Sequence, residues 1–150
     1  MRIKYIKINN LRNIAAVEIA AHPKLNFLVG ENGAGKTSIL EAVVLLAKGR
    51  SFRGGLISGL IGPEAARLTI VAETGQDDGT SHRLGVERGG RQWRARCNGQ
   101  AVKNLGGLAH LLPHVVLEPN SHQLIGGPPE ARRRYVDWSA FHVEHDHLSN

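Results

Sequence analysis

This sequence of 150 residues has little of three things on which many proteins depend: cysteine, aromatic side chains and long apolar runs. Cys97 is the single cysteine, which excludes a disulfide framework or a cysteine-based metal cluster within the chain and fits a reducing compartment. No stretch approaches the ~18 consecutive apolar residues of a membrane span. The first residues alternate charged and apolar side chains rather than forming a secretory leader. We therefore expect a cytoplasmic protein without a membrane segment.

Acidic residues are also scarce relative to basic ones. The chain has 19 Lys and Arg against 13 Asp and Glu, which gives a formal net charge of +6. The excess is concentrated between residues 82 and 103, where Glu87 is the only acidic residue. This balance favours a polyanion such as nucleic acid as a partner. With 41% hydrophobic residues, the chain is long enough for one domain with a buried core.

What the sequence does contain is a glycine-rich turn between two apolar segments. Gly30, Gly35, Lys36 and Thr37 match the phosphate-loop pattern G-x-x-x-x-G-K-[ST] without a mismatch. Glycines let successive backbone N–H groups point at phosphate oxygens, and the helix that follows adds the positive end of its dipole. Lys36 is predicted to contact the β- and γ-phosphates of ATP, and the Thr37 hydroxyl to bind Mg²⁺. The predicted nucleotide-binding residues here are Gly30, Glu31, Asn32, Gly33, Ala34, Gly35, Lys36, Thr37 and Ser38.

The segments around this loop predict an α/β fold. Strands are expected near residues 3–8 and 15–20, and the apolar run 24–29 is expected to be the strand that feeds the loop. A continuous apolar run is typical of a strand covered on both faces, which indicates a mixed sheet. A helix apolar nearly all round should begin near Lys36 and end at Lys48 and Gly49.

From Ala66 the apolar period changes to two, which predicts an antiparallel β-meander over residues 66–102. Its strands are expected at 66–73, 82–87, 91–97 and 100–102. Gly89-Gly90 and Asn98-Gly99 are typical two-residue hairpin turns. Further along, the pattern predicts a short helix within 103–112, an apolar strand at 114–117 and a helix that starts at Pro129.

The meander also supplies candidate DNA-binding residues. Arg94 and Arg96 alternate on one face of a strand and are positioned to follow a phosphate backbone, with Arg91 beside them. Trp93 either stacks on a base or is a buried residue of an ordinary sheet, and the sequence leaves both readings open. Arg53 lies in a basic loop, 50–55, which is either a solvated linker or a segment near nucleotide or DNA.

These residues carry a family resemblance. Residues 30–42 resemble the phosphate loop of ABC-type DNA-repair ATPases, a group that includes the structural-maintenance-of-chromosomes (SMC) and RecF families. Leu11-Arg12-Asn13 and the segment 49–53 are similar to segments of the RecF family. Residues 124–137 resemble the RecF signature of a Gly-Pro element, paired arginines, an aromatic and an aspartate. The resemblance covers essentially the whole chain.

The resemblance implies that residues 1–150 are the N-terminal lobe of an ABC-type P-loop NTPase head. It places Arg12 and Asn13 beside the nucleotide. In the RecF family, ATP closes a head homodimer on DNA at junctions of single and double strands. RecF then acts with RecR, and with RecO in the same pathway, to direct RecA to gaps during repair, replication-fork maintenance and the SOS response.

The sequence lacks, after Thr37, an apolar strand that ends in an acidic pair, the Walker B element that RecF heads use with a signature motif. The second half of the head is therefore expected to be absent, so no catalytic residue is assigned and hydrolysis is not expected from this chain alone. Two alternatives stay open. One is a nucleic-acid-binding module whose nucleotide site is only structural, and the other is a different P-loop enzyme such as a small kinase.

Overall fold

The protein was analysed as a computed structural model that describes residues 1–53, 59–90, 92–103, 106–117, 126, 129–130, 132–133 and 135–137. It forms two compact units, Met1–Leu112 and Pro113–Asn150. In the second unit, the described residues from 126 onward are helical, which includes Pro129 at the predicted helix start. The predicted strand at 114–117 is not formed. None of the described helices has the length and apolar character needed to cross a membrane.

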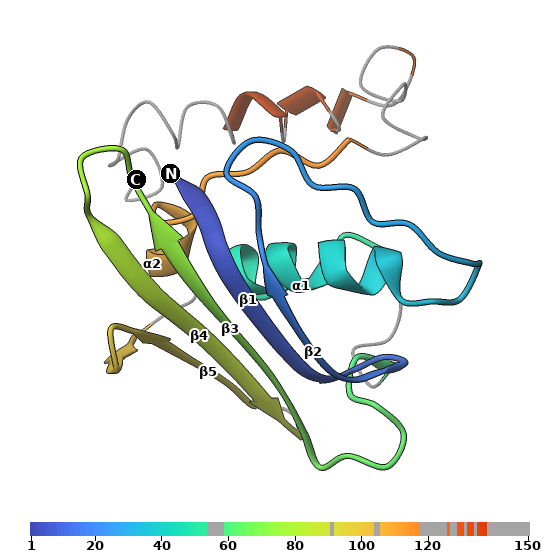
Figure 1. Cartoon of the computed structure of the whole chain (residues 1–150). Helices are drawn as coiled ribbons and strands as arrows, with labels where there is room; N and C mark the ends of the chain where they lie inside the picture. The colour runs from blue at the N-terminus through green and yellow to red at the C-terminus, as the bar shows by residue number, and fades with distance from the viewer. Residues whose placement is uncertain are drawn as a thin grey trace. The chain divides into compact units, whose positions relative to one another are not determined.

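The first unit is built on a six-stranded sheet in the order β2-β1-β3-β4-β5-β6, whose neighbours all pair antiparallel (Figure 1). The strands are β1 (Arg2–Leu11), β2 (Ile14–Ala20), β3 (Arg67–Gly75), β4 (Ser81–Gly89), β5 (Gln92–Cys97) and β6 (Gln100–Val102). The helices of this unit are α1 (Lys36–Lys48) and α2 (Gly106–Ala109). The predicted meander is thus confirmed in its four strands, β3 to β6.

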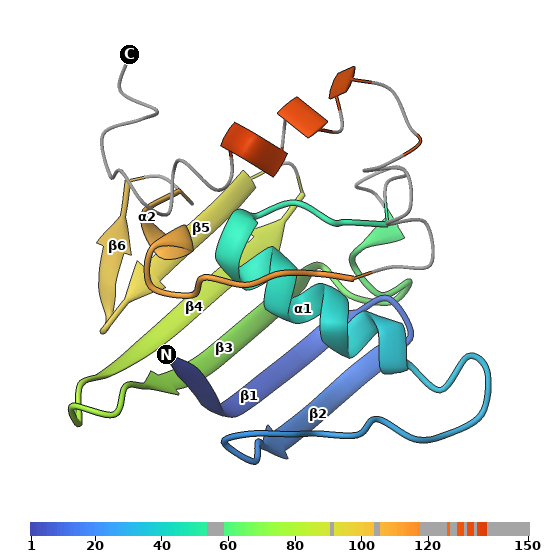
Figure 2. The same cartoon turned by 90° about the horizontal axis from the view of Figure 1, so that it is seen from above.

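Helix α1 lies across one face of the sheet, over β1, β3 and β4, with α2 beside it (Figure 2). Alternate side chains of the strands point to this helix and form the core with it. The fully buried large apolar side chains are Ile8, Leu11, Leu45, Leu46, Leu68, Ile70, Leu84 and Leu108. The helix ends as predicted: Gly49 adopts the left-handed conformation, and its N–H donates to the Leu45 carbonyl at 2.8 Å.

The other face of the sheet carries the polar residues of the same alternation. Its cross-strand rows follow from the register, in which Thr69 pairs with Glu87 and Glu87 with Arg94. Gly89, which was predicted to lie in the turn after this strand, is instead the last residue of β4 and pairs with Gln92. The predicted turn at Asn98-Gly99 is confirmed, since both residues have positive φ, as a type I′ hairpin requires.

The prediction of a mixed sheet with a strand at 24–29 was wrong for this chain. Residues 24–29 form no strand, and Leu25, Phe27 and Val29 are 61%, 79% and 92% exposed. An apolar run becomes a strand only where neighbouring strands satisfy its N–H and C=O groups. Within the described residues, β2 ends at Ala20 and no strand lies next to this segment. The apolar pattern alone therefore does not make this segment a strand, because within the described residues no strand pairs with it.

Candidate nucleotide-binding site

The predicted phosphate loop runs into α1 in a conformation that depends on glycine. Gly33 and Gly35 have φ of +84° and +92°, which other residues adopt only under strain. A Cβ on Gly35 would also lie 3.1 Å from Cγ1 of Ile14. The Ala34 N–H donates to the Glu31 carbonyl at 3.2 Å, and the Ile39 N–H donates to the Gly35 carbonyl at 3.0 Å to begin the helix. The loop is thus a tight turn fitted against the β1–β2 turn.

The start of α1 leaves its backbone donors available. In residues 35–39, all of which the structure describes, no side chain caps the helix and no acidic residue occupies the first turn. Helix N-termini usually carry such groups because the first N–H groups have no intrahelical acceptor. Here Lys36 is half-buried and Thr37 is exposed in the first turn, so an uncapped helix start is accessible, an arrangement that suits an anion such as phosphate.

Lys36 is held by the loop that precedes it. Its Nζ donates to the carbonyls of Gly30 and Glu31, both at 2.7 Å. An ammonium group has three N–H donors. Two of them therefore fix the side chain across the mouth of the loop, and the prediction assigns the third to a phosphate oxygen.

The two hydroxyls that follow Lys36 have different surroundings. Thr37 is exposed, whereas Ser38 is 4% exposed and its Oγ donates to Oδ1 of Asn13 at 3.3 Å. Mg²⁺ takes oxygen ligands and keeps several waters, so an accessible hydroxyl at the mouth of the loop fits its chemistry. Of the two, Thr37 is the accessible one, and its role as an Mg²⁺ ligand stays a prediction, whereas Ser38 supports the loop through Asn13.

Asn13 connects the β1–β2 turn to the phosphate loop. Its Nδ2 donates to the carbonyl of Gly33 while its Oδ1 accepts from Ser38. One amide therefore fixes both the loop and the first turn of α1. The structure places Asn13 against the predicted nucleotide site, as a residue that shapes the loop.

We expect Asn13→Ala to weaken binding of MgATP by about tenfold, since the loss of one or two hydrogen bonds at ~1 kcal/mol each frees the loop. Asn13 is exposed, so the midpoint of thermal unfolding should change little. Isothermal titration with ATP, alongside a melting curve of the variant, checks both parts. An affinity equal to that of the wild-type chain would show that the loop needs no support from this turn.

Arg12 lies in the same turn but is directed to α1. Its Nε and Nη2 donate to Glu41 at 3.0 and 2.7 Å, and its Nη1 donates to the Gly59 carbonyl at 3.1 Å. Glu41 is fully buried and also accepts a hydrogen bond from Ser51. Arg53, a predicted DNA-binding residue, lies 3.8 Å from the same carboxylate. Arg12 thus links the β1–β2 turn to α1 through Glu41 and to the segment after α1 through Gly59.

The Glu41 carboxylate stays charged in this setting. Burial alone would raise its pKa, but hydrogen bonds from Arg12 and Ser51 and the charges of Arg12 and Arg53 outweigh burial and leave the pKa below its ordinary value. Sequence reasoning missed Glu41. The available signal was an acidic residue inside an otherwise apolar helix, a position that normally requires a buried partner.

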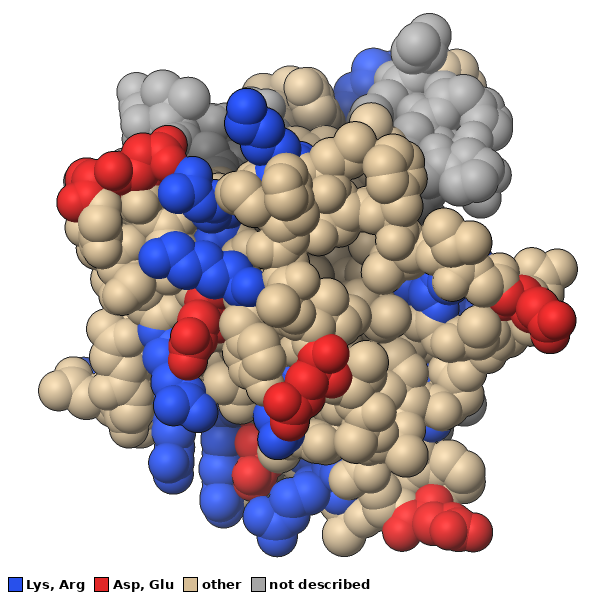
Figure 3. Space-filling model, viewed as in Figure 1, with Lys and Arg blue, Asp and Glu red and all other residues tan. Residues whose placement is uncertain are grey.

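The remaining predicted DNA-binding residues divide between the described and undescribed parts of the chain. Arg94 and Arg96 are exposed on the open face of β5, and Arg91 lies outside the described residues. Figure 3 shows Lys and Arg side chains gathered along the lower left, with acidic side chains between them. Trp93 packs against the core on the opposite face, with the Arg88 guanidinium 5.0 Å from its ring centroid. Of the two readings of Trp93, the structure therefore favours the sheet residue over base stacking.

Comparison with known proteins gives the family of this chain. Residues 1–83 match the model of the AAA ATPase domain family. The chain belongs to the AAA ATPase domain family. It is 44% identical to the DNA replication and repair protein RecF of Stenotrophomonas maltophilia, 43% to that of Xanthomonas axonopodis pv. citri and 40% to that of Pseudomonas putida. These alignments cover 96–99% of this chain but only 40–42% of the relatives, so the chain spans about two fifths of their length.

Solved structures give the same result. A structure of the recombination mediator protein RecF with ATP, from the RecFOR pathway, matches with a TM-score of 0.86 and 25% identity, over 97% of this chain and 39% of that one. The SMC head domain from Thermotoga maritima matches with a TM-score of 0.56 over 71% of this chain and 40% of that one, at 19% identity, which shows a shared fold alone. The predicted P-loop ATPase-head fold and the resemblance to RecF are confirmed. Of the signature at 124–137, the structure describes residues 126, 129–130, 132–133 and 135–137, and all of these are helical.

Proposed function

We propose that this chain is the ATP-binding lobe of a RecF-like ATPase that acts in DNA replication and repair. The observation that carries the proposal is the arrangement around Lys36: an anchored ammonium, an uncapped helix start and a glycine loop fixed by Asn13. The similarity to a RecF structure that contains ATP supports the same ligand. RecF relatives named as DNA replication and repair proteins support the process.

In this proposal the triphosphate enters the loop with its β- and γ-phosphates facing Lys36 and the backbone N–H groups of residues 32–37. Lys36 supplies a fixed positive charge, and its bonds to two carbonyls mean that it loses little freedom on binding. Thr37 would hold Mg²⁺, which would supply positive charge to offset that of the phosphates. The residues present bind and orient the nucleotide. Hydrolysis also needs an acid that orients water and a signature motif from a second head, which the family resemblance assigns to other segments.

The proposal includes partners and location. We infer DNA as a ligand, at junctions of single and double strands, from the basic open face and the RecF resemblance. RecR and RecO, with RecA downstream, belong to the same inference, supported by a solved relative from the RecFOR pathway. We also infer that complete heads dimerise when they bind ATP and that the protein is cytoplasmic.

Titration of the folded chain with a fluorescent ATP analogue and Mg²⁺ tests the proposal. We expect saturable binding, competed by unlabelled ATP, and no steady release of phosphate. Binding without turnover fits a lobe that holds nucleotide but needs other segments for chemistry. Steady turnover by the pure chain that disappears with Lys36→Ala would contradict the expected dependence on those segments.

The second candidate is a nucleic-acid-binding module whose nucleotide site is only structural, favoured by the basic open face of the meander. It predicts DNA affinity that falls steeply with salt and does not change when ATP is added. The ATPase-lobe proposal instead expects DNA affinity to change when ATP is added, so measuring DNA binding with and without ATP separates the two.

A further inference from the structure

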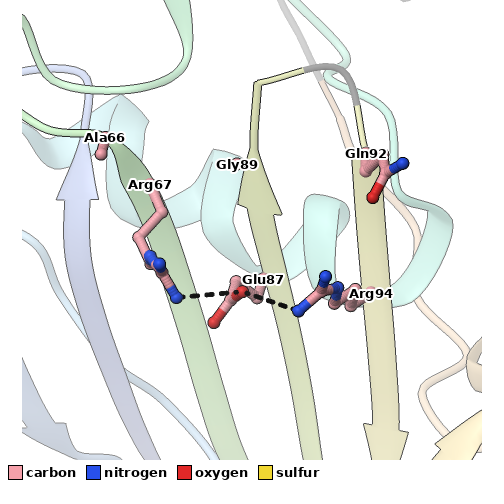
Figure 4. A pocket seen from close by; sticks show the side chains of 6 residues that line it. All are labelled: Ala66, Arg67, Glu87, Gly89, Gln92 and Arg94. Atoms are coloured by element: carbon pink, nitrogen blue, oxygen red, sulfur yellow. Dashed lines mark hydrogen bonds and ion pairs between the residues drawn. The ribbon is translucent and has the colours of Figure 1, made fainter.

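The open face of the meander contains a hollow between three charged side chains. Arg67 on β3, Glu87 on β4 and Arg94 on β5 point toward one another across the strands (Figure 4). The hollow has a volume of about 210 Å³ and is lined by Ala66, Arg67, Glu87, Gly89, Gln92 and Arg94. It lies on the face away from α1 and is separate from the phosphate loop.

Glu87 holds the two arginines only loosely. Its Oε1 lies 3.5 Å from Nη1 of Arg67 and 4.0 Å from Nη1 of Arg94, and the arginine side chains are 63% and 71% exposed. Exposed ion pairs of this kind are worth roughly 0–1 kcal/mol. Each guanidinium carries five N–H donors in a planar fork. Most of the hydrogen-bonding capacity of this pair is therefore directed at solvent.

The surrounding charge favours an anion with more than one phosphate. The open face of β3, β4 and β5 carries Arg67, Arg83, Arg94 and Arg96 against Glu73 and Glu87, which is four positive and two negative charges, or a net +2. Arg96 lies two residues along β5 from Arg94 on the same face, so the positive groups form a row rather than a point. A row of exposed arginines suits a polymer backbone better than a single anion.

The size of the hollow is consistent with that ligand. Its volume of about 210 Å³ leaves room for a phosphodiester group with part of its hydration shell. A phosphate between two guanidinium groups can accept charge-assisted hydrogen bonds from both, which are stronger than the long contacts that Glu87 makes.

We propose that the hollow between Arg67 and Arg94 is a binding site for a backbone phosphate of nucleic acid, and that Glu87 is an internal competitor for it. Glu87 occupies the place of the phosphate in the free protein, and a bound backbone displaces its carboxylate toward solvent. The proposal rests on the DNA-binding part of the proposed function and goes beyond it in naming the subsite and the residue that weakens it.

Glu87→Gln tests the proposal, measured by fluorescence anisotropy with a labelled single-stranded oligonucleotide and the corresponding duplex over a series of salt concentrations. We expect up to about fivefold tighter binding than the wild-type chain, the equivalent of removing an exposed ion pair of ~1 kcal/mol. Arg94→Gln should weaken binding and lower the salt slope by about one unit. In the Arg94→Gln background, Glu87→Gln should no longer increase the affinity.

Glu18→Gln is the matched control. Glu18 also lies on the open face, accepts hydrogen bonds from Tyr5 and Lys7 and contributes the same charge, but it belongs to β2 at the far edge of the sheet. An equal gain in both variants would mean that only net charge matters and would overturn the proposal. Unchanged binding in Glu87→Gln, when the wild-type chain binds DNA, would overturn it as well.

Two further results separate this proposal from the proposed function. If neither the wild-type chain nor any variant binds nucleic acid, the subsite and the DNA part of the proposed function are both wrong. ATP binding is tested separately by the ATP titration.

In a second experiment, inorganic phosphate is titrated into Glu87→Gln in place of DNA. Saturable binding of phosphate as tight as that of the oligonucleotide would identify a site for a free anion and overturn the assignment to a polymer backbone.

Discussion

Replacing Lys36 with alanine is expected to weaken MgATP binding by at least about 100-fold while the sheet stays folded. A charge-assisted hydrogen bond is worth roughly 1.5–3 kcal/mol, so loss of the ammonium alone accounts for about 10- to 100-fold. The variant also releases the carbonyls of Gly30 and Glu31, each held at 2.7 Å by Nζ. The nucleotide must then order the loop itself, which costs further affinity. The fluorescent ATP titration measures the effect, and far-UV circular dichroism checks the fold.

Lys24→Ala is the matched control for this variant. Lys24 is exposed and precedes the loop in sequence, so the substitution removes the same charge without touching the carbonyls that Lys36 holds. We expect its ATP affinity to stay within about twofold of the wild-type value, the scale of a screened surface charge. If both variants lost affinity equally, the effect would come from net charge, and Lys36 would have no special place in the site.

Replacing Arg12 with leucine is expected to lower the free energy of unfolding by about 3 kcal/mol. The change leaves the fully buried carboxylate of Glu41 without its closest cation, and breaking a buried pair typically costs 3–5 kcal/mol. The lower end applies because the Arg12 side chain is 23% exposed and Arg53 remains 3.8 Å away. Urea unfolding measures the loss directly, and the melting temperature should fall by roughly 6–12 °C.

The double variant Arg12→Leu/Glu41→Leu shows whether the loss of stability comes from leaving the Glu41 carboxylate buried without its cation. It removes the buried carboxylate as well, so we expect it to regain most of the lost stability. A double variant as unstable as Arg12→Leu alone would show that the cost comes from disturbed packing of the β1–β2 turn against α1. In that case the ion pair would contribute little.

The same pair predicts how stability depends on pH. The pKa of Glu41 is lowered in the folded chain, so its contribution is fully present above the unfolded value near 4.5 and is lost as pH falls through the folded pKa. The advantage of the wild-type chain over the double variant should therefore shrink below that pH. Urea unfolding of both proteins at about pH 7 and about pH 3 measures it.

Local chemistry explains which features the sequence could predict. The glycines and Lys36 determine the phosphate loop by themselves, and Gly49 ends α1 through a left-handed conformation that few other residues adopt. The alternation of β3 to β5 and the Asn98-Gly99 turn are equally short-range signals. Each depends on residues that are neighbours in the chain.

Contacts between distant segments were not predictable in the same way. Arg12 meets Glu41 across 29 positions of sequence, and the turn that carries it has a left-handed Arg12, which no pattern indicates. The resemblance to RecF implies that Arg12 lies by the nucleotide, which stays a prediction, and it gave no sign that the guanidinium donates to Glu41 and to the Gly59 carbonyl. The hollow beside Glu87 likewise depends on strand register, which brings Arg67 and Arg94 to the same side chain.

The exposed run before the phosphate loop has a consequence for regulation. Val29, which is 92% exposed, precedes Gly30, whose carbonyl holds Lys36. Any surface that covers Leu25, Phe27 and Val29 would restrain the same backbone that closes around phosphate. Two binding events that order one segment favour each other, and thermodynamic linkage makes the effect reciprocal. The segment therefore couples the two binding events. ATP should raise the affinity for any partner that packs on the apolar run, and that partner should raise the affinity for ATP by the same factor.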